Sequence, residues 1–82
     1  MLKLKSPLAR KGYLIYESLR HVLEPEHTGK YVAIEVDSGD YFLGNDLNEA
    51  LENAENEYPD REFFVVKVGK LATASFKHRH SI

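Results

Sequence analysis

The segment from Lys30 to Tyr58 restricts the fold of this chain more than any other part of the sequence. Residues 31–36 alternate as a strand does, with Val32, Ile34 and Val36 on one side. The residues at 37–40, Asp-Ser-Gly-Asp, form a turn signal, and Ser38-Gly39 suits a two-residue hairpin loop because glycine tolerates positive φ. We therefore expect a hairpin of strands 30–36 and 40–44, with Val36 opposite Tyr41 and Ile34 opposite Leu43.

A helix is predicted over residues 46–58, directly after this hairpin. Asp46 can cap it, and Glu49, three residues later, completes a capping box. Pro59 ends the helix near Tyr58 because proline cannot continue a helical hydrogen-bond ladder. The apolar side chains of this helix form a narrow stripe: Leu47, Ala50, Leu51, Ala54 and Tyr58.

The flanking regions predict a first helix and two further strands. Ser6 and Pro7 suit the start of a helix over 7–24, and the avoidance of helical geometry before a proline ends it ahead of Pro25. Gly12 inside this helix costs about 1 kcal/mol relative to alanine. Residues 62–68 are rich in aromatic and β-branched side chains and predict a third strand. Residues 71–77 predict an edge strand, followed by a basic tail at 78–82.

This order predicts a single α+β domain over residues 1–82. The simplest arrangement is a two-layer sandwich in the order α-β-β-α-β-β, with a three- to four-stranded, mainly antiparallel sheet and both helices on one face. The third strand would lie beside the first, and the crossover from second to third strand would be right-handed.

Composition and charge narrow the class of protein. The 82 residues include no cysteine, so disulfides and thiolate metal ligands are excluded, which favours a reducing, cytoplasmic location. No apolar run approaches the roughly 18 residues of a membrane-spanning helix, so a soluble protein without membrane association is expected. The net charge is +3 over residues 1–34, −9 over 35–62 and +4 over 63–82. Such a separation of charge along the chain can steer binding partners. Alternatively, the acidic residues simply keep one exposed helix and its flanks in water.

No catalytic constellation is recognisable, and we expect no enzyme activity and no cofactor. Glycine-rich phosphate motifs and a nucleophile-elbow context are absent from the sequence. Asp37 and Asp40 flank a turn, where aspartate is common for backbone reasons. His21, His27, His78 and His80 lack a ligand motif with a structural frame, so no metal site is expected.

Two binding functions remain. If both helices cover one sheet face, the aromatic and aliphatic side chains of the other face point outwards and predict an interaction surface for a protein partner or a second copy of the chain. The interaction surface consists of Tyr31, Phe42, Phe63 and Val65. Alternatively, the N-terminal arm or the last strand covers this face. The second function is nucleic-acid binding through the basic tail, Lys77, His78, Arg79 and His80, although the pI of about 6.1 is low for such proteins.

The same residues resemble a family of short prokaryotic proteins of unknown function. The resemblance rests on the strand Gly29-Lys30-Tyr31-Val32-Ala33, on Gly44 before a helix of the form Glu-Ala-Leu-Glu-x-Ala at 49–54, and on the Val-rich strand at 63–68. It covers roughly residues 13–70. The resemblance implies a genomic neighbourhood with a small retroviral-type aspartyl protease, and hence a partner, but it implies no catalytic residues.

Overall fold

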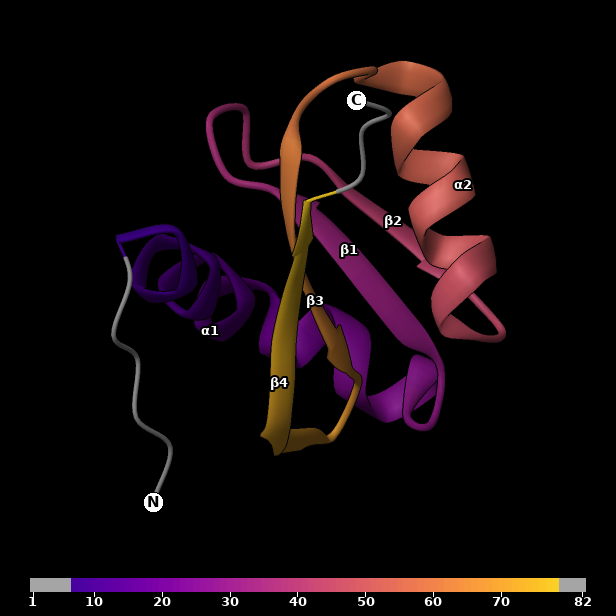
Figure 1. Cartoon of the computed structure of the whole chain (residues 1–82). Helices are drawn as coiled ribbons and strands as arrows, with labels where there is room; N and C mark the ends of the chain where they lie inside the picture. The colour runs from indigo at the N-terminus through magenta and orange to yellow at the C-terminus, as the bar shows by residue number, and fades with distance from the viewer. Residues whose placement is uncertain (1–6, 79–82) are drawn as a thin grey trace.

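The computed structural model describes residues 7–78, except for the side chains of residue 25 and of residues 70–78. The predicted helix cap at Ser6 and residues 79–82 of the predicted tail lie outside this part of the chain. The elements are α1 (Pro7–His27), β1 (Tyr31–Glu35), β2 (Tyr41–Gly44), α2 (Leu47–Glu57), β3 (Glu62–Lys67) and β4 (Lys70–His78). The predicted α+β class and the order of the elements are confirmed (Figure 1).

The four strands form one antiparallel sheet in the order β2-β1-β3-β4. β1 lies in the middle, where Ile34 is opposite Tyr41 of β2 and opposite Phe64 of β3. The third strand therefore lies beside the first, as predicted. β2 and β4 are the two edge strands (Figure 1).

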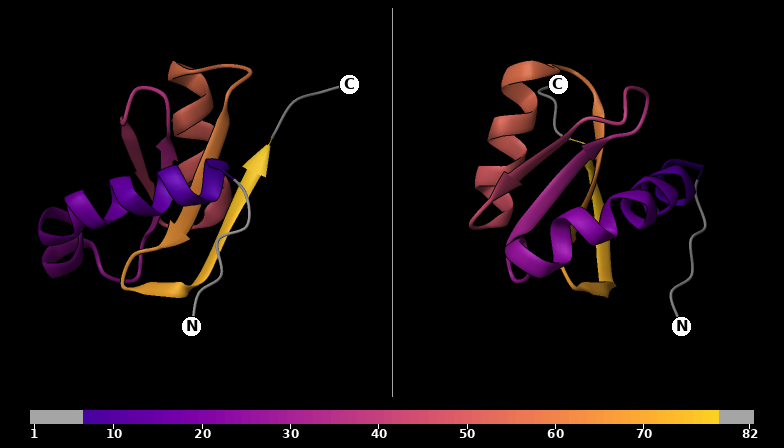
Figure 2. Two further views of the ribbon diagram at one scale, coloured as in Figure 1. Left: turned by 90° about the vertical axis from the view of Figure 1, so that its left-hand side faces the viewer. Right: turned by 180° about the vertical axis from the view of Figure 1, so that it is seen from behind.

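The two helices lie on opposite faces of the sheet, so the prediction of a two-layer sandwich with both helices on one face is wrong. α1 places Ala9, Tyr16 and Leu23 in a core with the side chains of Val32, Ile34, Phe64 and Val66. α2 places Ala50, Leu51 and Ala54 in a second core, against Ala33, Phe63 and Val65. The ribbon shows the sheet between the two helices in each view (Figures 1 and 2).

The physical reason for two helix layers is that β1 and β3 carry apolar side chains on both faces. Residues Phe63 to Val66 form a continuous apolar run, and all four are buried. Such runs are typical of strands that are covered on both sides, whereas strands with one wet face alternate between apolar and polar residues. A single helix layer would have left half of these side chains in water.

The β1–β2 hairpin has a four-residue loop, Val36 to Gly39, where the sequence predicted two residues. The backbone N–H of Glu35 donates to the carbonyl of Asp40 at 2.9 Å, and the N–H of Gly39 donates to the carbonyl of Glu35 at 2.8 Å. Gly39 has a φ of +83°, a conformation that glycine adopts without strain. The predicted pairing of Val36 with Tyr41 and of Ile34 with Leu43 is therefore wrong, because Ile34 is opposite Tyr41. The observed register differs from the predicted one by two residues, so every side chain stays on its predicted face of the sheet.

α1 continues three residues past its predicted end, through residue 25 to His27. A proline this close to a helix end removes one backbone donor and leaves most of the ladder intact. The preceding turn is anchored because Leu23 is fully buried and Glu24 accepts hydrogen bonds from Tyr16 and Arg20, each at 2.9 Å. The burial of Leu23 in the core and the side-chain hydrogen bonds of Glu24 within the helix therefore outweigh the local preference.

Gly12 lets α1 approach the sheet closely. It is buried inside the helix, and a Cβ atom at this position would lie 2.2 Å from Cγ of Phe64. No rotation of a terminal group relieves this overlap, because the nearest atoms are Cβ and Cγ of a buried ring. The lower helix propensity of glycine is thus offset by the packing of α1 on β3.

Gly12→Ala should therefore destabilise the protein by about 1–3 kcal/mol through overpacking, although alanine is the better helix former by about 1 kcal/mol. Urea unfolding followed by circular dichroism measures the change. Ser18→Ala, at an exposed position of the same helix, is the control and should stay within about 0.5 kcal/mol of the parent. A Gly12→Ala variant as stable as the parent would contradict the close approach of α1 and Phe64.

Candidate functional site

The predicted interaction surface on the sheet is largely buried. Phe63 and Val65 have an exposed fraction of 0 % and pack beneath α2. Tyr31 and Phe42, at the margin of the same face, are half-buried against the same core. The prediction of an open apolar sheet face is therefore wrong, because the apolar stripe of α2 covers this face.

The predicted basic surface falls mostly outside the described part of the chain. Lys77 and His78 lie in β4, without a described side chain, and Arg79 and His80 lie beyond it. Among the side chains that the structure describes, no group of three or more His, Cys, Asp or Glu is placed to hold a metal ion. Within residues 7–78, neither helix is long and apolar enough to cross a membrane.

The free edge of the sheet at β2 forms a groove between the two helices. Its volume is about 580 Å³. Leu19 of α1 lines one side, Tyr41 and Phe42 of β2 line the floor, and Asn53, Asn56 and Glu57 of α2 line the other side. Seen from behind, β2 runs along the open edge of the sheet with α1 and α2 on its two sides (Figure 2, right). The sequence did not predict this groove.

The backbone of β2 offers hydrogen-bonding groups to this groove. The bond from Glu35 N–H to the carbonyl of Asp40 fixes the alternation of the antiparallel pair, so Tyr41 and Leu43 direct their N–H and C=O groups away from β1. The carbonyl of Leu43 accepts a hydrogen bond from Nδ2 of Asn53 at 2.9 Å. This side-chain bond covers one of the outward acceptors on an edge that no described strand occupies.

The two walls of the groove differ in chemistry. On the α1 side, Leu19 lines the groove next to Tyr41 on the floor, and both are half-buried. Two further apolar side chains on this side lie outside the lining: Leu43 is half-buried, and Val22 is 44 % exposed. Val22 follows Leu19 by three residues and thus lies on the same side of the helix. On the α2 side, the wall consists of the two amides and the carboxylate of Asn53, Asn56 and Glu57. One wall is apolar and the other is polar and acidic.

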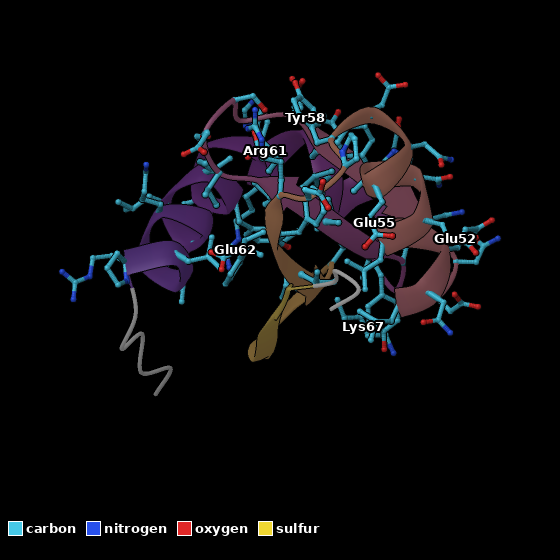
Figure 3. The ribbon with its side chains drawn as sticks, turned by 45° about the horizontal axis from the view of Figure 1, so that its top comes forward. Glu52, Glu55, Tyr58, Arg61, Glu62 and Lys67 are labelled. Carbon is cyan, nitrogen blue, oxygen red and sulfur yellow. The ribbon has the colours of Figure 1, made fainter. Side chains whose placement is uncertain are left out.

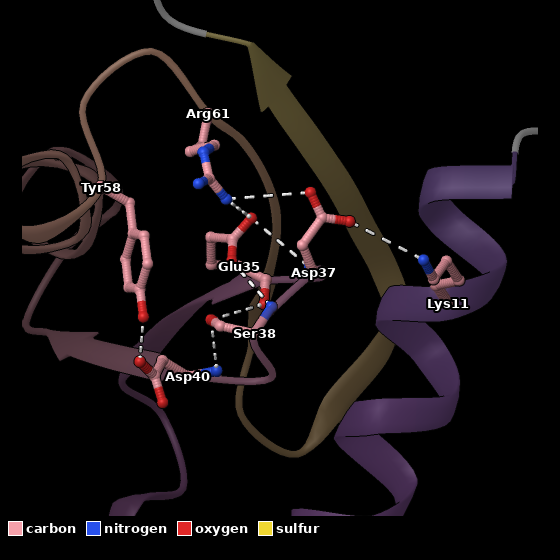
Figure 4. A network of polar contacts seen from close by, with 7 residues as sticks. All are labelled: Lys11, Glu35, Asp37, Ser38, Asp40, Tyr58 and Arg61. Carbon is pink, nitrogen blue, oxygen red and sulfur yellow. Dashed lines mark hydrogen bonds and ion pairs between the residues drawn. The ribbon is translucent and has the colours of Figure 1, made fainter.

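A network of polar contacts holds the hairpin loop at one end of the groove (Figure 4). Glu35 is buried, with an exposed fraction of 1 %, and its carboxylate accepts hydrogen bonds from the N–H groups of Ser38 at 2.9 Å and Asp37 at 3.4 Å. Nη1 of Arg61 lies 3.2 Å from the same carboxylate. Burial opposes ionisation of Glu35, but the hydrogen bonds from Ser38, Asp37 and Arg61 outweigh it and hold the pKa of Glu35 below its ordinary value.

The same network ties the loop to both helices. The hydroxyl of Tyr58 donates a hydrogen bond to Asp40, which raises the pKa of Tyr58, and its ring packs edge-to-face on Phe42 with centroids 6.1 Å apart. Asp37 lies 3.8 Å from Nη1 of Arg61 and 3.8 Å from Nζ of Lys11 on α1. These carboxylates are engaged in holding the loop in place, which gives the groove a fixed end.

A comparison with protein families matches residues 23–70 to the family of unknown function DUF5678. The match covers more than half of the chain. The chain belongs to the DUF5678 family. No curated protein and no solved structure is significantly similar to it. The family match thus covers the hairpin, α2 and β3 of this DUF5678 member, together with the end of α1.

α2 is a strongly acidic element of this DUF5678 member. Within Leu47–Glu57 there are four glutamates and no lysine or arginine. Glu52 points outwards from α2 (Figure 3), whereas Glu57 lines the groove. Of the described residues that line the groove, Asp40 and Glu57 are acidic and none is a lysine or arginine. The charged side chains that line the groove in the described part of the chain are therefore negative.

Glu35→Gln should destabilise the fold by about 1–3 kcal/mol at pH 7, because the amide loses the charge-assisted hydrogen bond from Arg61 and offers fewer acceptors to the buried turn. Because the pKa of Glu35 is depressed, the unfolded chain binds more protons than the folded chain as the pH falls through the ordinary glutamate value of about 4.5. The stabilising effect of Glu35 should be complete above that pH and be lost as the pH falls through the lower pKa of the folded state. Urea unfolding between pH 3 and pH 7 measures both effects.

Asp37→Asn is the matched control for this measurement. The side chain of Asp37 is 68 % exposed and its carboxylate makes two ion pairs of 3.8 Å, so its replacement should cost no more than about 1 kcal/mol. Equal losses in the two variants, or a Glu35→Gln variant with the acid dependence of the parent, would show that the buried carboxylate does not stabilise the loop.

Proposed function

We propose that this chain is a small protein-binding module without enzyme activity, and that it binds its partner in the groove along the β2 edge. The proposal rests on one observation: β2 directs backbone groups into a groove whose sides are formed by both helices. Peptide segments bind to exposed sheet edges in this way, with main-chain hydrogen bonds for affinity and side-chain pockets for specificity.

The β2 edge is a suitable candidate because it is weakly protected. Exposed edges are usually blocked by bulges, prolines or inward charges, since they otherwise pair with any extended chain. In the described part of β2, residues 41–44, proline and lysine are absent, and Asn53 covers only the carbonyl of Leu43. Half-buried apolar side chains beside such an edge gain further burial when a partner covers them.

The family resemblance suggests one partner to test first, the retroviral-type aspartyl protease implied by the genomic neighbourhood. Nucleic-acid binding through the tail from Lys77 to His80 is the alternative. It would depend steeply on salt, because it would rest on phosphate contacts of lysine and arginine.

The proposal is tested by selecting peptides from a random display library on the purified chain and measuring their affinity by fluorescence anisotropy. Leu19→Arg should weaken the binding of the selected peptides by at least about tenfold, because it places a bulky charge in the apolar wall of the groove. Leu14→Arg is the matched control: Leu14 is in the same helix and is 61 % exposed, and it does not line the groove. This variant should bind like the parent.

Thermal unfolding of both variants separates lost binding from lost folding. If Leu19→Arg does not fold, amide chemical shifts of the parent provide the test, because a bound peptide should shift the signals of residues 41–44 and of Asn53. The proposal is overturned if the library yields no binder, or if the binders shift other signals. It is also overturned if the chain binds DNA or RNA with a steep salt dependence and selects no peptide.

A further inference from the structure

We infer that the segment bound in the β2 groove is an extended strand of another protein, in which apolar residues alternate with lysine or arginine. This inference rests on the proposed function and specifies the chemistry of the partner. It follows from three features of the groove: the free backbone edge, the contrast between its two walls, and the charge of α2.

The backbone edge requires an extended partner. Tyr41 and Leu43 both point their N–H and C=O groups away from β1, in the plane of the sheet, and this spacing of two residues matches the hydrogen-bonding period of a neighbouring antiparallel strand. β2 spans only four residues, so the paired segment is short. A helix cannot satisfy these groups, because its own backbone groups are already bonded within the helix.

The contrast between the two walls of the groove requires a partner strand in which apolar and cationic side chains alternate. Successive side chains of a strand point to opposite faces of the sheet. In a strand added at β2, every second side chain would therefore meet Leu19 and Tyr41 on the α1 side, and the others would meet Asn56 and Glu57 on the α2 side. Apolar residues suit the first position, and residues with long cationic side chains suit the second.

The charge of α2 distinguishes a cationic partner from a second copy of this chain. A symmetric pairing of two β2 strands would place the two α2 helices on the same face of a continuous sheet. Each helix carries four glutamates and no base over Leu47–Glu57, so the pairing would bring like charges together. Lysine or arginine in the partner strand would instead be attracted to the same helix.

Asn53 limits the register of the added strand. Its side-chain amide occupies the carbonyl of Leu43, whereas the N–H and C=O of Tyr41 and the N–H of Leu43 point outwards without such a cover. An incoming N–H group must displace the Asn53 amide or share the carbonyl with it. The strongest pairing is therefore expected at Tyr41, next to the hairpin loop that Glu35 holds.

The strand geometry is tested with the peptides that bind the parent chain and lose affinity for Leu19→Arg. N-methylation at successive positions should weaken binding by at least about tenfold at every second residue and have little effect at the residues between, because only alternate N–H groups face β2. A continuous block of sensitive positions, or a helical period of three to four residues, would overturn the inference while leaving the groove as the binding site.

The charge of the partner is tested with Glu57→Lys, and Glu52→Lys is the matched control on the outer side of the same helix. We expect lysine or arginine at alternate positions of the selected peptides, and Glu57→Lys should weaken their binding about fivefold more than Glu52→Lys does at low salt. Equal effects of the two variants, or selected peptides without alternating basic residues, would overturn the inference.

Sedimentation of the parent chain should show a monomer, and a dimer that Leu19→Arg dissociates would identify a second copy as the occupant instead. Failure to obtain any groove-binding peptide is a different outcome, because it overturns the proposed function itself.

Discussion

The burial of both faces of β1 and β3 is the constraint on which the rest of this structure depends. Val32, Ile34 and Phe64 need a cover on one face, and Ala33, Phe63 and Val65 need one on the other. A chain of 82 residues buries only about 60 % of its unfolded surface, so it cannot leave either set in water. α1 and α2 therefore lie on opposite faces, and β2 is left at the edge, between their exposed flanks.

The individual helices and strands could be predicted because the sequence signals for each of them lie within a few neighbouring residues. Asp46 accepts a hydrogen bond from the N–H of Glu49 at 2.8 Å, as the sequence of the cap indicates, although the side chain of Glu49 bonds Asn45 instead of closing the box on Asp46. The arrangement of the helices could not be predicted in the same way, because the run from Phe63 to Val66 is apolar on both faces and does not indicate which helix covers which face. The hairpin register depended on Glu35, whose carboxylate binds the backbone of the loop. The burial of Glu35 could not be predicted, because the sequence shows only a polar residue at the end of a strand.

Two glycines have a role that helix and strand propensities do not describe. A Cβ atom on Gly12 would overlap Phe64, and one on Gly44 would lie 2.3 Å from the backbone nitrogen of Ala50. Both positions are contacts between a helix and the sheet, one for each helix. Gly44 is part of the sequence pattern that resembles the family, and packing explains its position before α2. Without a side chain, Gly44 allows the start of α2 to pack directly on the end of β2. In this way both helices come close enough to form the sides of the β2 groove.

The groove depends on contacts between residues that are distant in sequence, which is why no motif predicted it. Leu19, Tyr41 and Asn53 come from three different elements and meet only because the sheet order places β2 at the edge. Filling the groove would also act on the whole molecule, since a partner that binds only the folded state stabilises it by mass action. The hairpin loop is already fixed by Glu35, Arg61 and the bond between Tyr58 and Asp40, so little ordering of this end is required on binding. If the proposed partner strand binds at this preformed edge, the half-buried side chains of the groove would gain the burial that a chain of this size lacks on its own.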